Sequence, residues 1–414
     1  MSVEHNFYLW YNPQDRYYYL NCQNFFDGFC ISSHLAAHYG NAFSAILNET
    51  SKSYFIDPET VAFQTFDLTS FYNENGNLRM SWEKILDQYP SQIKEIIKSR
   101  RSLTISDFIN KRGEFAPLLY DLILQVISFQ QRIIENRISG LSDFMDVTPE
   151  LQFIVAPYFY FNSIQDDWYK INIKILNEFN DLKINNHKYV IICFNKDILL
   201  QERDIEILSS DFLKSNIDGY LLWINSFDET NEQMIYFDNL IKLIHNFSHN
   251  NKKIINLYGS YFSILSSYWG MSGHVSGVNS RDLREVNEML IGGGPPGGPI
   301  PRYYIPPLHT RVVIDQGVRM IRQFNEFQCD CPVCQTNRHG YNPSIDRSEG
   351  RRIMNRHFLY IRNKEINDVK THSYADTFSQ IDQIYRQYEM SRAILPISHL
   401  RNWWGAITRN INLL

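Results

Sequence analysis

The segments YVIICFN (residues 189–195) and IDGYLLWIN (217–225) are apolar runs rich in β-branched and aromatic residues, and each ends in asparagine. Runs of this length are typical of strands that are buried on both faces. Similar runs are GFCISS (28–33), SYFIDPET (53–60), LQFIVAPYFYF (151–161) and KIINLYG (253–259). Segments with helical periodicity, such as 166–182 and 229–247, lie between the later runs. Strands that alternate with helices predict repeated β/α units and a parallel sheet from 151 to 270.

No glycine-rich phosphate turn follows the first of these runs, so we expect a TIM-like (β/α)8 barrel and not an open doubly wound sheet. The clearest helix before residue 150 is predicted over 115–138. IGGGPPGGPIPRYYIPPLH (291–309) is predicted to be a long loop, because proline lacks a donor and glycine resists ordering. The predicted divisions are barrel strands in 1–290, a rim loop in 291–310, a zinc-binding insertion with the end of the barrel in 311–365, and C-terminal helices in 366–414. One or two solvent-exposed helices are expected in 363–391.

The composition is that of a globular protein, with 414 residues of which 44% are hydrophobic. The N-terminus lacks a basic segment followed by a long apolar run, and no apolar stretch is long enough to span a membrane. We therefore expect a cytoplasmic protein with no membrane partner. Cys22, Cys30 and Cys193 each stand alone in apolar surroundings and are expected to be buried, structural thiols.

The charge is distributed unevenly along the chain. Residues 281–363 contain 12 arginines, no lysine and 8 acidic residues, so this segment carries +4 while the remainder carries −9. The planar guanidinium group can bind two phosphate oxygens at once. The segment is therefore either a cationic surface for nucleic acid or a solvated face that its own carboxylates balance.

The stretch CDCPVCQTNRHGYNPSIDRSEGRRIMNRHF (329–358) places Cys329, Cys331 and Cys334 within six residues. Three thiolates and one imidazole form the closed tetrahedral ligand set of a structural zinc site. His357 is the preferred fourth ligand, because a distant ligand would clamp a helix to the loop, and His339 is the alternative. A closed set leaves no position for water, so we expect the zinc to be structural, and this argues against a zinc hydrolase.

The Cys-x-Cys-x-x-Cys motif with its later histidine resembles the zinc-binding insertion of the tRNA-guanine transglycosylases, which are α/β barrels. IDGYLLWINSFDET (217–230) is similar to the strand FDGYAIGGLSVGE of that family, with Trp223 and Ile224 in place of its paired glycines. YFIDPETVAFQ (54–64) and GGGPPGGPIPRYYIPPLH (292–309) look more like the DpdA-type DNA-guanine transglycosylases. The resemblance covers roughly residues 25 to 365.

The resemblance implies an enzyme that replaces guanine in DNA with a 7-deazaguanine, such as 7-cyano-7-deazaguanine, through a covalent glycosyl-aspartate intermediate. Asp57 matches the aspartate to which that family assigns proton transfer. The nucleophilic aspartate of the family falls on Val275, and the first carboxylate beyond it is Asp282. Either Asp282 or another acid serves as nucleophile, or the chain is a catalytically inactive subunit that binds nucleic acid.

Base recognition also departs from the family pattern. The run 153–161 contains no carboxylate at the place where the family reads guanine, whereas Tyr158 and Tyr160 could stack on a flipped base. Asn195 stands where the family has glutamine, and His274 is a further candidate for contact with the substrate. A tRNA substrate in place of DNA remains open, as do a homodimer or partner proteins of a DNA-modification system.

Overall fold

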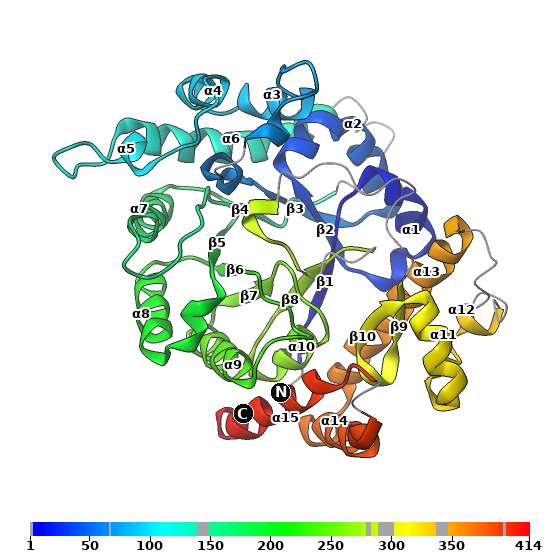
Figure 1. Ribbon diagram of the computed structural model, residues 1–414. Coiled ribbons are helices and arrows are strands. Elements are labelled where there is room, and N and C mark those ends of the chain that lie inside the picture. Colours follow the sequence, from blue (N-terminus) through cyan, green and yellow to red (C-terminus); the bar gives the residue numbers. More distant parts are fainter. Residues whose placement is uncertain are drawn as a thin grey trace.

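The computed structural model describes residues 3–65, 68–138, 149–278, 283–288, 302–336, 347–391 and 395–414. Within these residues, eight parallel strands follow one another around a barrel in chain order, with helices outside them (Figure 1). The strands are β1 (Asn6–Trp10), β2 (Gly28–Ser32), β3 (Ser53–Asp57), β4 (Phe153–Val155), β5 (His187–Asn195), β6 (Gly219–Asn225), β7 (Lys253–Asn256) and β8 (Gly273–Ser276). The predicted TIM-like barrel is confirmed.

The two end strands of the sheet, β3 and β4, meet. The backbone N–H of Tyr54 donates to the carbonyl of Glu150 at 3.0 Å, and the N–H of Gln152 donates to the carbonyl of Tyr54 at 3.0 Å. These bonds bring the two edges of the sheet together, so the carboxyl ends of the strands gather at one rim. We call this end of the barrel the C-terminal rim.

Amphipathic helices cover the outer face of the barrel. In α7, Asp166 accepts a hydrogen bond from the N–H of Trp168 and caps the helix, and the buried residues Asn172, Leu176 and Phe179 recur at helical spacing. The helices of this layer are α1 (Arg16–Asn21), α2 (Ser33–Thr50), α3 (Met80–Leu86), α4 (Ser91–Lys98), α5 (Ile105–Phe108), α6 (Pro117–Ile138), α7 (Asp167–Asp181), α8 (Glu202–Leu213), α9 (Met234–His249) and α10 (Tyr261–Leu265).

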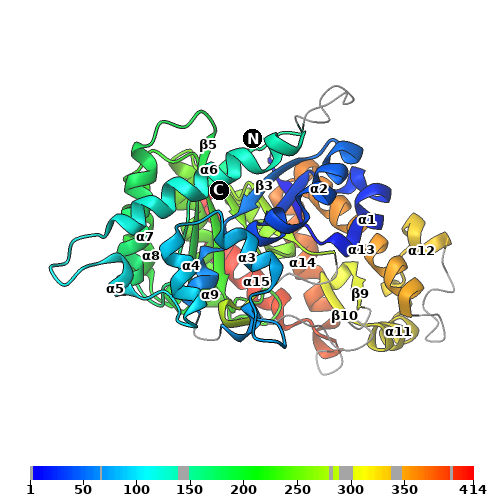
Figure 2. The same ribbon diagram turned by 90° about the horizontal axis from the view of Figure 1, so that it is seen from above.

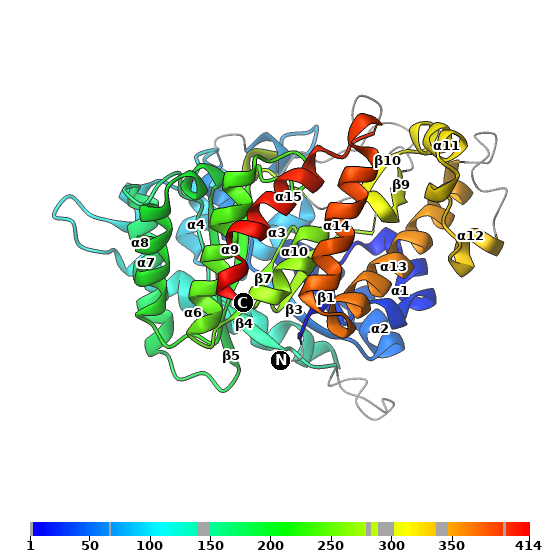
Figure 3. The same ribbon diagram turned by 90° about the horizontal axis from the view of Figure 1, so that it is seen from below.

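The C-terminal part packs against one side of the barrel. Its elements are β9 (Arg302–Ile305), β10 (Thr310–Val313), α11 (Ile314–Gln323), α12 (Pro332–Thr336), α13 (Arg347–Thr371), α14 (Tyr374–Tyr388) and α15 (Ser398–Arg409). β9 and β10 form an antiparallel pair. Figure 2 shows α11 and α12 on the side of the barrel opposite α7 and α8. Figure 3 shows α15 beside α9, with α14 next to it. No helix among the described residues has the length and apolar character needed to cross a membrane.

Several predicted elements differ from the structure. Strand β1 was not predicted, and the run 151–161 forms a strand only over Phe153–Val155. The end of the predicted loop 291–309 is ordered as β9 and a short turn, whereas 289–301 lies outside the described residues. The expected solvent-exposed helices of 363–391 are the end of α13 and α14, and both bury an apolar stripe that includes Val369 and Phe378.

The barrel interior is filled by aromatic side chains. Phe55 contacts Tyr8 edge-to-face at 5.3 Å between ring centroids and stacks on Phe153 at 4.7 Å, and Phe153 stacks on Tyr189 at 3.8 Å. Tyr189 is in turn paired with Gly219 of β6. A Cβ atom at Gly219 would lie 2.3 Å from a ring carbon of Tyr189, so only glycine leaves room for this ring.

Substitution of Gly219 is expected to destabilise the barrel. Gly219→Ala should lower the free energy of unfolding by about 1–3 kcal/mol, because the methyl group overpacks a filled interior. Gly350→Ala on α13 is the matched control, since a Cβ there meets no atom within 4 Å and alanine favours the helix by about 1 kcal/mol. Urea unfolding measures both changes, and equal stability of the two variants would contradict the packing described here.

Candidate active site and metal centre

Asp57 is the last residue of β3 and lies at the C-terminal rim, where enzymes of this fold carry their active sites. Its side chain is fully buried. Oδ1 accepts hydrogen bonds from the Tyr158 hydroxyl and from the backbone N–H of Glu59, each at 2.9 Å. Oδ2 has no hydrogen-bond partner within the described structure. A buried polar atom without a partner is costly, and such atoms often mark a site where a ligand or proton is handled.

The environment of Asp57 favours its protonated form. Burial and the nearby carboxylate of Glu59 raise the pKa of Asp57 to about 7, although the hydrogen bonds from Glu59 and Tyr158 oppose the shift. A carboxyl group with this pKa can donate and accept protons near neutral pH.

Glu59 is a second buried carboxyl group, two residues beyond Asp57. Its backbone has left-handed angles (φ 48°, ψ 30°), which cost a residue other than glycine about 1–3 kcal/mol and persist where the surroundings impose them. Oε2 lies 2.5 Å from Nδ1 of His34, and Oε1 lies 3.5 Å from the Arg284 guanidinium. Burial opposes the ionisation of Glu59, but the charges of His34 and Arg284 outweigh it and lower its pKa below the usual value.

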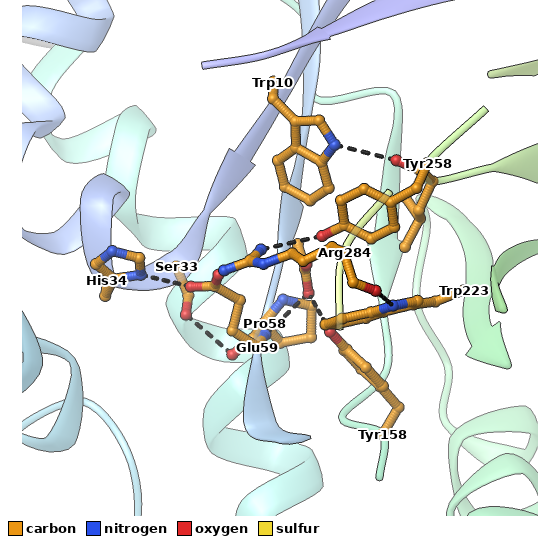
Figure 4. A network of polar contacts seen from close by, with 11 residues as sticks. Trp10, Ser33, His34, Pro58, Glu59, Tyr158, Trp223, Tyr258 and Arg284 are labelled. Carbon is orange, nitrogen blue, oxygen red and sulfur yellow. Dashed lines mark hydrogen bonds and ion pairs between the residues drawn. The ribbon is translucent and has the colours of Figure 1, made fainter. Parts of the chain in front are cut away.

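We call the opening of the barrel at the C-terminal rim the barrel mouth. Arg284, in the segment 283–288, lies there among aromatic side chains (Figure 4). Its guanidinium carbon is 5.7 Å from the ring centroid of Trp223 and 6.0 Å from that of Trp10, within the range of a cation–π contact. Nη1 donates to the Tyr258 hydroxyl at 3.0 Å. The Trp223 indole N–H donates to the carbonyl of Arg284 at 3.2 Å, so the segment is held to the rim by its backbone as well.

Tyr158 and Tyr160 follow β4, and side chains of the loop after β3 pair with their backbone. Thr60 bonds both the N–H and the carbonyl of Tyr158, at 2.8 and 2.6 Å, and Gln64 does the same for Tyr160 at 2.9 and 2.8 Å. These bonds explain why the apolar run leaves the strand yet stays ordered. The structure therefore places Tyr158 beside Asp57, with Tyr160 farther along the same rim.

Asn195 ends β5 and accepts a hydrogen bond from the N–H of Asp197, so it caps a short helical turn. His274 does not join the rim residues. It is paired with Phe7 on β1, stacks on that ring at 4.7 Å between ring centroids, and lies 2.7 Å from His5. Tyr8, whose side chain fills the barrel interior, is paired with Val275, so by alternation His274 faces the helix layer.

Val275 is thus the residue of β8 that faces the barrel interior, at the position where the resemblance expects an aspartate. Asp282 lies outside the described residues. The rim residues that the sequence analysis did not single out for the site are Trp10, Glu59, Trp223, Tyr258 and Arg284. Two local signals were present, namely the second acid in IDPET, two positions after Asp57, and Trp223 in place of a family glycine.

The predicted metal ligands form one cluster. One donor atom from each of Cys329, Cys331, Cys334 and His357 lies within 4.8 Å of the others. Nδ1 of His357 is 3.4 Å from Sγ of Cys331 and 3.3 Å from Sγ of Cys334. Hydrogen bonds with Cys329 and Cys334 hold the pKa of the Cys331 thiol well below its usual range. This cluster could hold a metal ion.

The fourth ligand is oriented by backbone hydrogen bonding. Nε2 of His357 lies 2.8 Å from the carbonyl oxygen of Tyr304, which can only accept, so Nε2 carries a proton and Nδ1, which faces the sulfurs, is the atom that would bind a metal ion. The imidazole also stacks on Tyr303 at 4.7 Å between ring centroids. The sequence-based choice of His357 agrees with this geometry, and the alternative His339 lies outside the described residues.

The arginines of residues 281–363 do not all lie on the surface. Arg362 is fully buried, the guanidinium of Arg311 packs 3.5 Å above the ring of Phe358, and Arg284 lies in the barrel mouth. Described arginines that are exposed are Arg302, Arg319, Arg322 and Arg352. The cationic surface is therefore smaller than the sequence count indicates.

Comparison with known proteins adds little to this geometry. No model of a known protein family matches the sequence, and no curated protein matches it. Among solved structures, xylanase B from Clostridium stercorarium F9 matches with a TM-score of 0.34 and 10% identity, over 66% of this chain and 85% of that chain. This likeness is too weak to support an argument, so the functional inference rests on the rim and the metal cluster.

Loss of a cluster ligand is expected to remove bound metal. Elemental analysis of the purified protein should give one metal ion per chain, bound by the cluster. Cys331→Ser should abolish the binding and lower the free energy of unfolding by several kcal/mol, because metal binding of this kind is coupled to folding. Cys22→Ser, at a buried cysteine outside the cluster, is the matched control and should retain the metal. Full metal content in Cys331→Ser would exclude the site.

Proposed function

We propose that the chain is a base-exchange transglycosylase that removes guanine from DNA and installs a 7-deazaguanine, such as 7-cyano-7-deazaguanine. The observation that carries the proposal is Asp57, a buried carboxyl group at the barrel rim with one unpaired oxygen and a pKa of about 7. The resemblance assigns proton transfer to this position. A group that is half protonated at neutral pH can protonate a leaving base and deprotonate an incoming one.

The exchange takes place in two steps, after which Asp57 and the attacking carboxylate have returned to their starting states. First, a carboxylate bonds to the sugar C1′ while the bond from C1′ to N9 of guanine breaks, and the departing base keeps the electron pair and takes a proton from Asp57. Second, the incoming base gives its proton to Asp57 and attacks C1′, which releases the carboxylate. We assign the attacking carboxylate to Asp282, the nearest acid in the sequence after the aligned position Val275. Covalent glycosyl intermediates of this kind are known for carboxylate nucleophiles.

The aromatic lining of the rim supports a flipped base as substrate. The barrel mouth is walled by buried rings, among them Trp10, Tyr158, Trp223 and Tyr258. A base that leaves its stack, at a cost of a few kcal/mol, regains stacking on such rings.

The cluster of three cysteines and His357 is proposed to bind zinc. Thiolates together with an imidazole nitrogen are the usual ligands of structural Zn²⁺, and four of them complete its tetrahedral shell. The ion would join the loop at Cys329 to helix α13 and take no part in the exchange.

The exposed arginines Arg302, Arg319, Arg322 and Arg352 are proposed to contact nucleic-acid phosphates. DNA is the preferred polymer because the sequence looks more like the DNA-modifying branch. A catalytically inactive subunit that binds nucleic acid is the second candidate, and the specific observation in its favour is the inward-facing Val275. A tRNA-guanine transglycosylase is the third.

Release of guanine tests the proposal. The protein is incubated with guanine-labelled DNA, and separately with labelled tRNA, in the presence of 7-cyano-7-deazaguanine. Release is expected from DNA, and Asp57→Asn should slow it by about 10²–10⁴-fold, the usual contribution of a general acid. Asp121→Asn, at an exposed position on α6, is the matched control. Release from tRNA alone would assign the tRNA activity, and binding without release from either polymer would support the inactive subunit.

The rate of guanine release is expected to fall as pH rises above about 7, because Asp57 must be protonated to donate. Single-turnover release measured across pH 5–9 checks this (about two pH units on either side of the pKa). Tyr158→Phe should move the fall to higher pH, since the Tyr158 hydroxyl stabilises the charged form of Asp57. A fall that stays in place in Tyr158→Phe would show that another group titrates.

A further inference from the structure

The side chain of Arg284 lies in the barrel mouth. Trp10, Trp223 and Tyr258 surround its guanidinium group, and the carboxylate of Glu59 faces it. We call the space bounded by these four residues the Arg284 pocket. Its three aromatic walls adjoin, because the Tyr258 ring stacks on Trp10 at 5.3 Å and lies 5.1 Å from Trp223 between ring centroids.

We propose that the Arg284 pocket binds a planar ligand with an amidine or guanidine edge, and that Arg284 occupies the pocket when the ligand is absent. A carboxylate accepts two parallel N–H bonds from such an edge, and aromatic rings bind its face. This inference rests on the proposed function for the identity of the natural ligand, which is the base with the N1–H and 2-amino edge of guanine. Glu59 then reads the base in place of the carboxylate missing from 153–161.

The charges around the pocket exclude an anionic ligand. Glu59 is fully buried beside the pocket, and its contacts with His34 and Arg284 favour its ionised form. A phosphate or carboxylate in the pocket would meet this negative charge in a setting of low dielectric constant, where repulsion is strong. Groups rich in N–H donors are the chemical class that fits.

The contacts of Arg284 are compatible with exchange for a ligand. Its guanidinium lies 3.5 Å from Glu59, longer than the 2.5 Å contact between Glu59 and His34. When Arg284 leaves, Glu59 therefore keeps one close partner and is not left as an isolated buried charge. The left-handed backbone at Glu59 fixes its carboxylate toward the pocket, because hydrogen bonding from its N–H to Asp57 holds the turn.

Competition between Arg284 and the ligand has a measurable consequence. A ligand that binds only after Arg284 has left has an apparent affinity reduced by the fraction of molecules with an open pocket. If Arg284 fills the pocket in about nine molecules of ten, about one in ten can bind the ligand. Substitution of Arg284 by a smaller residue then tightens ligand binding about tenfold.

Binding of benzamidine to the full chain tests the inference. Benzamidine carries the planar amidine edge without a sugar or polymer, and Trp10 and Trp223 give a fluorescence signal from the pocket wall. Arg284→Ala is expected to bind it about tenfold more tightly than the unaltered protein, and Glu59→Gln to lose binding by at least about tenfold, the loss expected for a charged hydrogen-bond partner. Arg203→Ala, at an exposed position on α8, is the matched control and should bind like the unaltered protein.

Unchanged or weaker benzamidine binding in Arg284→Ala, in a protein that unfolds cooperatively, would overturn the inference and make Arg284 a structural ion pair. Retained binding in Glu59→Gln would also overturn it. If either variant fails to fold, Arg284→Gln and Glu59→Asp repeat the comparison with smaller changes. Guanine release is measured separately. Benzamidine binding without guanine release would support the pocket and contradict the proposed function. Guanine release with no effect of either variant on benzamidine binding would contradict only the pocket.

Discussion

The contact between β3 and β4 is the constraint on which the rest of the molecule depends. The two hydrogen bonds of the Tyr54 backbone join the ends of an eight-stranded parallel sheet, and a long connection of helices lies between these strands in the chain. Because all eight strands are parallel, their carboxyl ends lie on one edge of the sheet, and closure removes exposed strand edges and curves that edge into one rim. Residues as distant in sequence as Trp10, Glu59 and Tyr258 therefore meet in one small space. The side chains of the rim come from several strands, and no two of these strands would bring all of them together.

Two buried carboxyl groups at this rim set the electrostatics of the barrel mouth. Both cannot be ionised without cost at low dielectric constant, and their environments separate them. His34 and Arg284 hold the charge on Glu59, so the proton goes to Asp57, whose pKa is raised to about 7 by burial and by Glu59. Any group that replaces Arg284 must also offer donors to Glu59. The raised pKa of Asp57 and the preference we propose for a ligand with N–H donors are therefore two consequences of one charge distribution.

Much of the barrel was readable from the sequence, because strands buried on both faces leave continuous apolar runs such as 189–195 and 217–225. The three cysteines could also be predicted as one cluster, because they lie within six residues of one another. Asp57 and Tyr158 were identified from the sequence, but the contacts of Glu59 with Arg284 and the nearness of Trp10 were not, because no local pattern joins these distant segments. The prediction that His274 contacts the substrate does not fit the structure, because successive side chains of a strand face opposite sides and His274 faces the helix layer.

A chain of buried contacts extends from the metal cluster toward the barrel rim. His357 bonds the carbonyl of Tyr304, whose hydroxyl donates to Glu365 at 2.6 Å. Glu365 lies 3.1 Å from Arg362, which reaches the Ser260 hydroxyl, at 3.3 Å, in the turn after β7. A metal ion bound by His357 would therefore also fix helix α13, which places a buried ion pair against the turn next to Tyr258. Such a pair is tolerated only while its geometry holds, because a misplaced partner leaves a buried charge uncompensated. The metal cluster and the barrel mouth are thus joined by packing, so an ion bound by the cluster would also support Tyr258, one wall of the proposed Arg284 pocket.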